Sequence, residues 1–251
     1  MADPCPTPWP ARDARFVTTH WSLVVSAARP DSTSAQAALE ELCRTYWYPL
    51  YAFVRRTGRA THDAQDLVQG FFAACLSGRY LDAADPGKGR FRSFLLLMLK
   101  RYLANEWDKE RAVKRGGGQT PVALDGLTAE ERYALEPSNT LSADRLYERR
   151  WALTLLEHVL DRLADEQAAA GKSTTFARLR AHLTAADTTT PYAALAAELG
   201  LGEGAVKVAV HRLRRRYREL LEEEIARTVA DPANPGEIAD ERRHLLSVLS
   251  T

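Results

Sequence analysis

Apolar positions recur at helical spacing over most of this chain. Large apolar residues return every three or four positions across residues 21–113, and a second helical pattern covers residues 147–163, with one apolar face made by Trp151, Leu155, Val159 and Leu163. Such spacing is typical of amphipathic α-helices. Runs of β-branched and aromatic residues between turn signals are scarce. The pattern therefore predicts an all-α protein.

Two polar stretches divide the helical pattern. The first, "KRGGGQTPVALDG", carries three consecutive glycines and a proline, which continue a helix only at a cost, and the second is "AADTTTP". We therefore expect two small helical domains, over residues 15–115 and 191–225. A linker with its own helical segment would join them over residues 116–190, and residues 226–251 would form a C-terminal extension.

Residues 200–220 are both amphipathic and the most basic part of the chain. Apolar residues before this stretch predict a helix that Gly200 ends, as a C′ glycine does, and a short turn follows. The next helix has one apolar stripe, made by Val206, Val210, Leu213, Tyr217 and Leu220. Two helices joined by a tight turn, the second amphipathic and basic, indicate a helix-turn-helix, although a purely structural basic helix would show the same charge run.

A helix-turn-helix places the start of its second helix in the major groove of DNA. Side chains near that start would face base edges, and the later arginines would reach phosphates. The first group is Glu203, Lys207, Val208, His211 and Arg212, and the second is Arg214, Arg215, Arg216 and Arg218.

Composition narrows the remaining functions. The 34 basic and 33 acidic residues leave a net charge of +1, so any nucleic-acid surface must be local. No apolar run approaches the ~20 residues of a membrane span, and no secretory signal is visible. The three cysteines lie far apart, which fits a reducing cytoplasm and argues against a zinc site or a disulfide framework. We expect a cytoplasmic protein that does not enter a membrane.

Sequence signatures of catalysis are missing as well. The chain has no glycine-rich phosphate loop, no nucleophile elbow and no His/Cys/Asp cluster at metal-ligand spacing, and "GGGQTP" lacks the lysine that a phosphate loop needs. We therefore expect no catalytic residues, no cofactor and no metal.

Two motifs resemble one protein family. "PYAALAAELGLGEGAVKVAVHRLRRRYRELL" resembles region 4 of the extracytoplasmic-function sigma factors of the sigma-70 family, which place this helix-turn-helix in the −35 promoter element. "THDAQDLVQGFFAACL" resembles region 2 of the same factors, where an acid-x-x-Asp-Leu-x-Gln pattern precedes an aromatic pair. The two regions stand in the family's order and cover a little over half of the chain. The resemblance implies a subunit that directs bacterial core RNA polymerase to promoter DNA and starts transcription.

The resemblance also implies a polymerase-binding surface. In the family, the region 2 helix meets the coiled coil of the largest polymerase subunit, and the matching side chains here are Asp63, Asp66 and Gln69. Thr61 is the expected N-cap of this helix. Without the family match, both aspartates would be ordinary acids at a helix start, where carboxylates oppose the positive helix end.

A −10 surface is implied next to it. "SGRYLDAADPGKGRFRSF" resembles the family's loop that captures a flipped base, and the helix after it would carry the strand-separating surface. Such a surface needs cations for phosphates and flat groups for unstacked bases. The residues that fit are Lys88, Arg90, Arg92, Lys100, Arg101, Asn105, Trp107 and Lys109. Trp107 fits packing and DNA contact equally well.

Some features depart from the family. Gly70 stands where most members carry an acid, "VKVAVHR" lacks the usual Ser-Arg pair, and the middle section and tail are long. The last two features are similar to a subgroup linked with serine/threonine protein kinases. A phosphoryl group on Thr61 would make up the charge that Gly70 omits, so Thr61 is either a cap only or also a phosphorylation site.

The expected partners are core RNA polymerase, promoter DNA and a serine/threonine protein kinase or another regulator. We also expect the tail from Ile225 to pack onto the rest of the protein as a control element, because its last helix has one apolar face. The alternative function is a stand-alone helix-turn-helix transcription regulator, which would leave the region 2 motif without a role.

Overall fold

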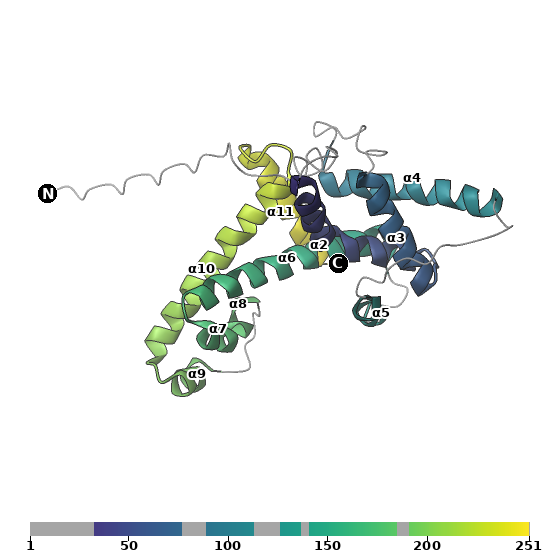
Figure 1. Ribbon diagram of the computed structural model, residues 1–251. Helices are drawn as coiled ribbons and strands as arrows, with labels where there is room; N and C mark the ends of the chain where they lie inside the picture. The colour runs from purple at the N-terminus through teal and green to yellow at the C-terminus, as the bar shows by residue number, and fades with distance from the viewer. Residues whose placement is uncertain (1–32, 77–88, 113–125, 137–140, 185–190, 251) are drawn as a thin grey trace.

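The computed structural model describes residues 33–76, 89–112, 126–136, 141–184 and 191–250, and within these ranges the chain forms helices and no strand (Figure 1). The expectation of an all-α protein is therefore confirmed. Lys88 and the side chain of Lys109 lie outside the described residues. No helix in the described part of the chain combines the length and the apolar character that a membrane crossing requires.

Three helices from the first half of the chain pack together. They are α2 (Thr33–Arg56), α3 (Thr61–Leu76) and α4 (Phe91–Ala112), and α3 contacts both of the others. Their apolar faces are buried, and fully enclosed side chains include Tyr46, Leu50, Phe71, Phe91 and Leu99. Burial of these faces accounts for the helices, since apolar side chains at helical spacing gain most from packing against each other.

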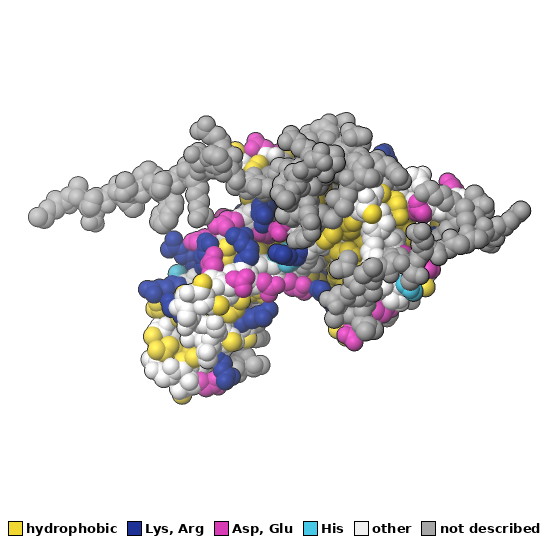
Figure 2. All heavy atoms as spheres, in the orientation of Figure 1, with side chains coloured by type: hydrophobic (Ala, Val, Ile, Leu, Met, Phe, Trp, Pro, Cys, Tyr) yellow, Lys and Arg dark blue, Asp and Glu magenta, His cyan; other side chains and the backbone are white. Residues whose placement is uncertain are grey.

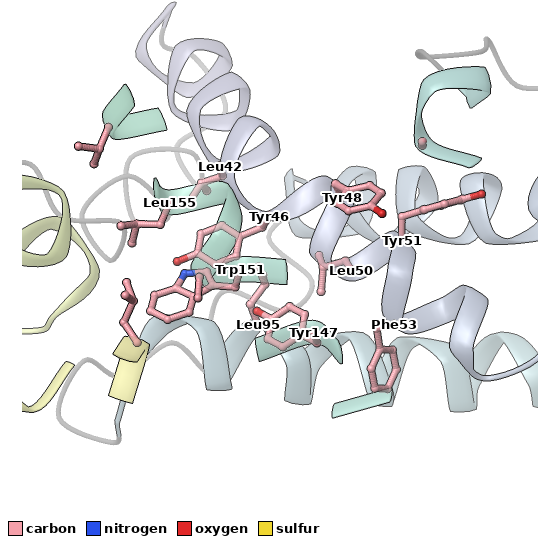
Figure 3. Close-up of a cluster of buried hydrophobic side chains, with 14 of the residues drawn as sticks. Leu42, Tyr46, Tyr48, Leu50, Tyr51, Phe53, Leu95, Tyr147, Trp151 and Leu155 are labelled. Carbon is pink, nitrogen blue, oxygen red and sulfur yellow. The ribbon is translucent and has the colours of Figure 1, made fainter. Parts of the chain in front are cut away.

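The helix expected in the linker is the central packing element. It is α6 (Ala143–Ala169), which contacts α2, α7, α10 and α11. Ser142 caps it, because its hydroxyl accepts a hydrogen bond from the N–H of Arg145 at 3.3 Å. The predicted apolar face of Trp151, Leu155, Val159 and Leu163 is buried. In Figure 3, Trp151 lies against Tyr46 of α2, so this face joins the two halves of the chain.

Short helices flank this centre. They are α5 (Gly126–Ala134), α7 (Ser173–Leu179) and α8 (Ala181–Thr184). Glu130 attaches α5 to α2, because its carboxylate accepts hydrogen bonds from Arg55 Nη2 at 2.6 Å and from Arg55 Nε at 3.0 Å. The sequence pattern did not predict α5.

The remaining helices complete the other end of the molecule. They are α9 (Tyr192–Leu199), α10 (Glu203–Thr228) and α11 (Pro235–Leu249). Figure 1 shows α10 running beside α6, with α7, α8 and α9 at one end of the pair and α11 packed near the other. Asn234 caps α11, because its side chain accepts a hydrogen bond from the N–H of Gly236 at 2.9 Å. The expectation that the tail packs onto the rest of the protein is met by α11.

Candidate nucleic-acid interface

A helix, a tight turn and a second helix lie within residues 191–228, where the helix-turn-helix was expected. Gly200 follows α9 with φ of 65°, the left-handed conformation that glycine adopts without a steric penalty. The N–H of Leu201 then bonds the carbonyl of Ala196 at 2.9 Å, which closes the turn before α10 begins at Glu203. The apolar stripe faces inward, with Val206, Val210, Leu213 and Leu220 buried. The opposite side of the first turns of α10 is therefore free to meet a ligand.

All five side chains expected to read bases lie on that free side. They are Glu203, Lys207, Val208, His211 and Arg212, and each is exposed. Lys207 is not isolated: its Nζ lies 2.6 Å from Glu203 Oε1, and this hydrogen bond raises the pKa of the Lys207 ammonium. Glu203 must therefore release Lys207, or share it, when Lys207 contacts DNA.

The later arginines divide into two kinds. Arg215 and Arg218 are exposed, and Arg215 pairs with Glu219 at 3.0 Å. Arg214 and Arg216 point back into the protein instead. Arg214 Nε donates to the carbonyl of His182 at 2.9 Å.

Arg216 binds Glu166 of α6 through two of its guanidinium nitrogens. Its Nε and Nη2 donate to the two Glu166 oxygens at 2.8 and 2.6 Å. This pair raises the pKa of Arg216 and lowers the pKa of Glu166. Arg214 and Arg216 were expected to contact phosphates. In the structure their guanidinium groups instead bind α8 and α6 and hold α10 in place.

The residues expected at the −10 element fall into two groups, one on the exposed side of α4 and one at its start. Lys100, Arg101, Asn105 and Trp107 share its exposed side. Lys100 pairs with Asp144 at the start of α6, and the guanidinium of Arg59 lies 4.9 Å from the centre of the Trp107 ring. Trp107 therefore packs on one face against a cation and is still 53% exposed, so both of its expected roles stay open.

Arg90 and Arg92, at the start of α4, are occupied. Arg92 is only 6% exposed: its Nε lies 2.8 Å from Glu148 Oε2, its Nη1 pairs with Glu241, and its guanidinium covers the Trp151 ring. Arg90 pairs with Glu237 at 3.1 Å and with Glu241 at 3.2 Å. Both arginines were expected to meet DNA, but here their partners are carboxylates of α6 and α11.

The third expected surface lies on α3. Asp63 is exposed, Asp66 is partly exposed beside His62 at 3.7 Å, and Gln69 is half-buried. Thr61 is not the N-cap, because the carbonyl of Ala60 accepts the first helical hydrogen bond, from Ala64 N–H at 2.9 Å. Arg55 lowers the pKa of the Glu130 carboxyl on α5 most strongly, and the Thr61 side chain contributes in the same direction.

Figure 2 shows Lys and Arg side chains gathered over the part of the molecule that holds α10 and α6, with Asp and Glu side chains among them. Within the described residues, no three His, Cys, Asp or Glu side chains are placed to hold a metal ion together. Comparisons of this chain with protein-family models, with curated proteins and with solved structures give no match.

Proposed function

We propose that this protein is a sigma factor of the extracytoplasmic-function type, which directs core RNA polymerase to promoters and has no catalytic activity of its own. The observation that carries the proposal is the presence, in one chain and in the family's order, of two separate surfaces. One is the acidic side of α3 beside the exposed side of α4, and the other is the exposed start of α10 in a helix-turn-helix.

Each surface has a chemistry that suits one partner. The exposed start of α10 offers a base-reading set of cationic, apolar and imidazole side chains, which fits the −35 duplex. The exposed side of α4 offers Lys100, Arg101, Asn105 and Trp107, which fits phosphates and unstacked bases near −10. Asp63 and Asp66 offer carboxylates to a basic polymerase surface. A serine/threonine protein kinase is the regulator that the resemblance suggests.

A stand-alone helix-turn-helix regulator is the competing function, and polymerase dependence separates the two. The experiment measures binding of the purified protein to genomic DNA fragments with and without core polymerase. A sigma factor co-elutes with core polymerase and selects fragments mainly in its presence. DNA selection that is complete without polymerase, together with no co-elution, would favour the stand-alone regulator.

A further inference from the structure

We propose that α11 occupies, within the same chain, a phosphate-binding site formed by Arg90 and Arg92, and that promoter DNA reaches this site only when α11 is displaced. The inference rests on the proposed function, because it names what regulates the −10 surface. It assigns the C-terminal helix a defined role as a competitor of DNA.

The contact between α11 and the start of α4 is specific. Glu237 and Glu241 lie one helical turn apart on α11, and Arg90 and Arg92 flank the first residue of α4. Glu241 bridges both arginines through its two carboxylate oxygens, Oε2 to Arg90 and Oε1 to Arg92, and Glu237 adds a second contact to Arg90. These contacts join distant parts of the chain, since Arg92 and Glu241 are 149 residues apart in the sequence.

A carboxylate and a phosphate bind a guanidinium group in the same way, through paired N–H donors to anionic oxygens. The two glutamates therefore hold the same N–H groups that a DNA backbone would use. DNA and α11 would compete for Arg90 and Arg92, because the Glu241 side chain is 1% exposed and its two oxygens already bind both guanidinium groups.

Apolar packing of α11 is limited, with Val248 and Leu249 only partly buried against the core. Leu245 is its one buried apolar side chain among the described residues, whereas Leu246 is 60% exposed. Ion pairs therefore contribute to the docking, and DNA phosphates would compete with these carboxylates for the same guanidinium groups. His244 of α11 also contacts α6, with its Nε2 2.9 Å from Glu148 Oε2.

The site keeps a partner for its buried charge when α11 leaves. Arg92 retains Glu148 of α6 at 2.8 Å, and the Tyr147 hydroxyl still donates to the Arg92 carbonyl at 2.9 Å. Displacement thus leaves no isolated buried cation, which would be strongly unfavourable. DNA phosphates would then replace the two carboxylates of α11.

The first test removes the two carboxylates in the full chain. The variant Glu237→Gln/Glu241→Gln is compared with Asp161→Asn/Asp240→Asn. This control removes the same charge from an exposed acid of α6 and from an acid of α11 that pairs with Arg243 of its own helix. The probe is a mixed-sequence single-stranded DNA 20-mer, followed by fluorescence anisotropy over a salt series. Circular dichroism checks that both variants fold.

We expect the first variant to bind the DNA roughly tenfold more tightly than wild type. Its plot of log affinity against log salt should be steeper by about 1.4, which corresponds to two more phosphate contacts on a single strand. The control variant should match wild type. Equal affinity and slope for both double variants would overturn the proposal.

The second test follows α11 in the wild-type protein by hydrogen exchange. Amides of residues 237–249 should exchange faster when core polymerase and promoter DNA are added, and unchanged or stronger protection would overturn the proposal, even if the Gln variant fails to fold. Failure of the competition can be told apart from failure of the proposed function. Core-dependent DNA binding with α11 still docked refutes only the competition, whereas no DNA binding with core polymerase refutes the proposed function and the competition with it.

Discussion

The hydroxyl of Tyr102 lies where a side chain on Gly70 would begin. A Cβ at position 70 would overlap this hydroxyl, because α3 and α4 approach closely there and Tyr102 packs 5.8 Å from the Phe71 ring. Tyr102 is buried and cannot swing away freely. A glycine at position 70 therefore has a steric reason, which is separate from the resemblance to region 2, where an acid would be expected at this position.

Gly70→Ala should lower the free energy of unfolding by about 1–3 kcal/mol, the usual cost of overpacking. Tyr102→Phe removes the overlapping atom, so the loss on Gly70→Ala should be much smaller in the Tyr102→Phe background. Urea unfolding of the four proteins in this double-mutant cycle measures the coupling. A coupling free energy of zero would contradict the steric account.

Asp66→Arg should weaken binding to core polymerase without unfolding the protein. The partly exposed carboxylate becomes a cation on a surface expected to meet basic groups, and like-charge contacts in an interface cost several kcal/mol. Asp161→Arg makes the same charge change on an exposed position of α6 and serves as the control. If both variants retain core polymerase equally well in a pull-down, the α3 surface is not the binding surface.

Substitutions in α10 should separate base reading from backbone binding. Lys207→Gln and His211→Gln should change the preferred −35 sequence, whereas Arg218→Gln should weaken all sequences about equally and reduce the salt slope by about 1. Selection from a random duplex pool measures both effects. The base-reading assignment fails if all three variants lose affinity uniformly.

Loss of the Glu166–Arg216 pair should appear as a change in stability with pH. Arg216 lowers the pKa of Glu166 below its usual 4.5, so the folded state gains stability above pH 4.5 and loses it as the pH falls through the lowered pKa. Glu166→Gln should cost about 0.5–1 kcal/mol at pH 7, because the pair is partly exposed, and less at pH 3.

Asp165→Asn is the control for this measurement, since Asp165 is an exposed neighbour on the same helix. Thermal or urea unfolding of the three proteins at several pH values is sufficient. A wild-type advantage over Glu166→Gln that stays constant from pH 7 to pH 3 would contradict the assigned pair.

Thr61 tests the hypothesis of a phosphorylation switch. Thr61→Glu should raise promoter activity by adding the charge that Gly70 omits, and Thr61→Ala should leave the protein inactive. Reporter transcription with both variants measures the effect, and indistinguishable activities would end the hypothesis.

Local pattern was sufficient to predict several elements. The stripe from Val206 to Leu220 and the glycine at 200 indicated the helix-turn-helix, and the face of Trp151 indicated α6. These features depend on residues close together in the chain, where helical spacing and capping act directly.

Long-range contacts were beyond that reasoning. Nothing near Arg92 indicates that Glu241 covers it, and nothing near Gly70 indicates Tyr102. Pro49 would usually end a helix, yet α2 continues through it because its surroundings are buried by packing. Arginines of α10 also look alike in sequence, and only the positions of Glu166 and His182 separate structural ones from exposed ones.

Transcription in a purified system tests the central claim most directly. Core RNA polymerase, this protein and a promoter fragment recovered with their complex are incubated with nucleotides, and the run-off transcript is measured against Asp66→Arg as the matched control. The account predicts a transcript of defined start that requires both core polymerase and the wild-type protein, and that falls strongly with the variant. Core polymerase that gives the same transcript without this protein would contradict the account.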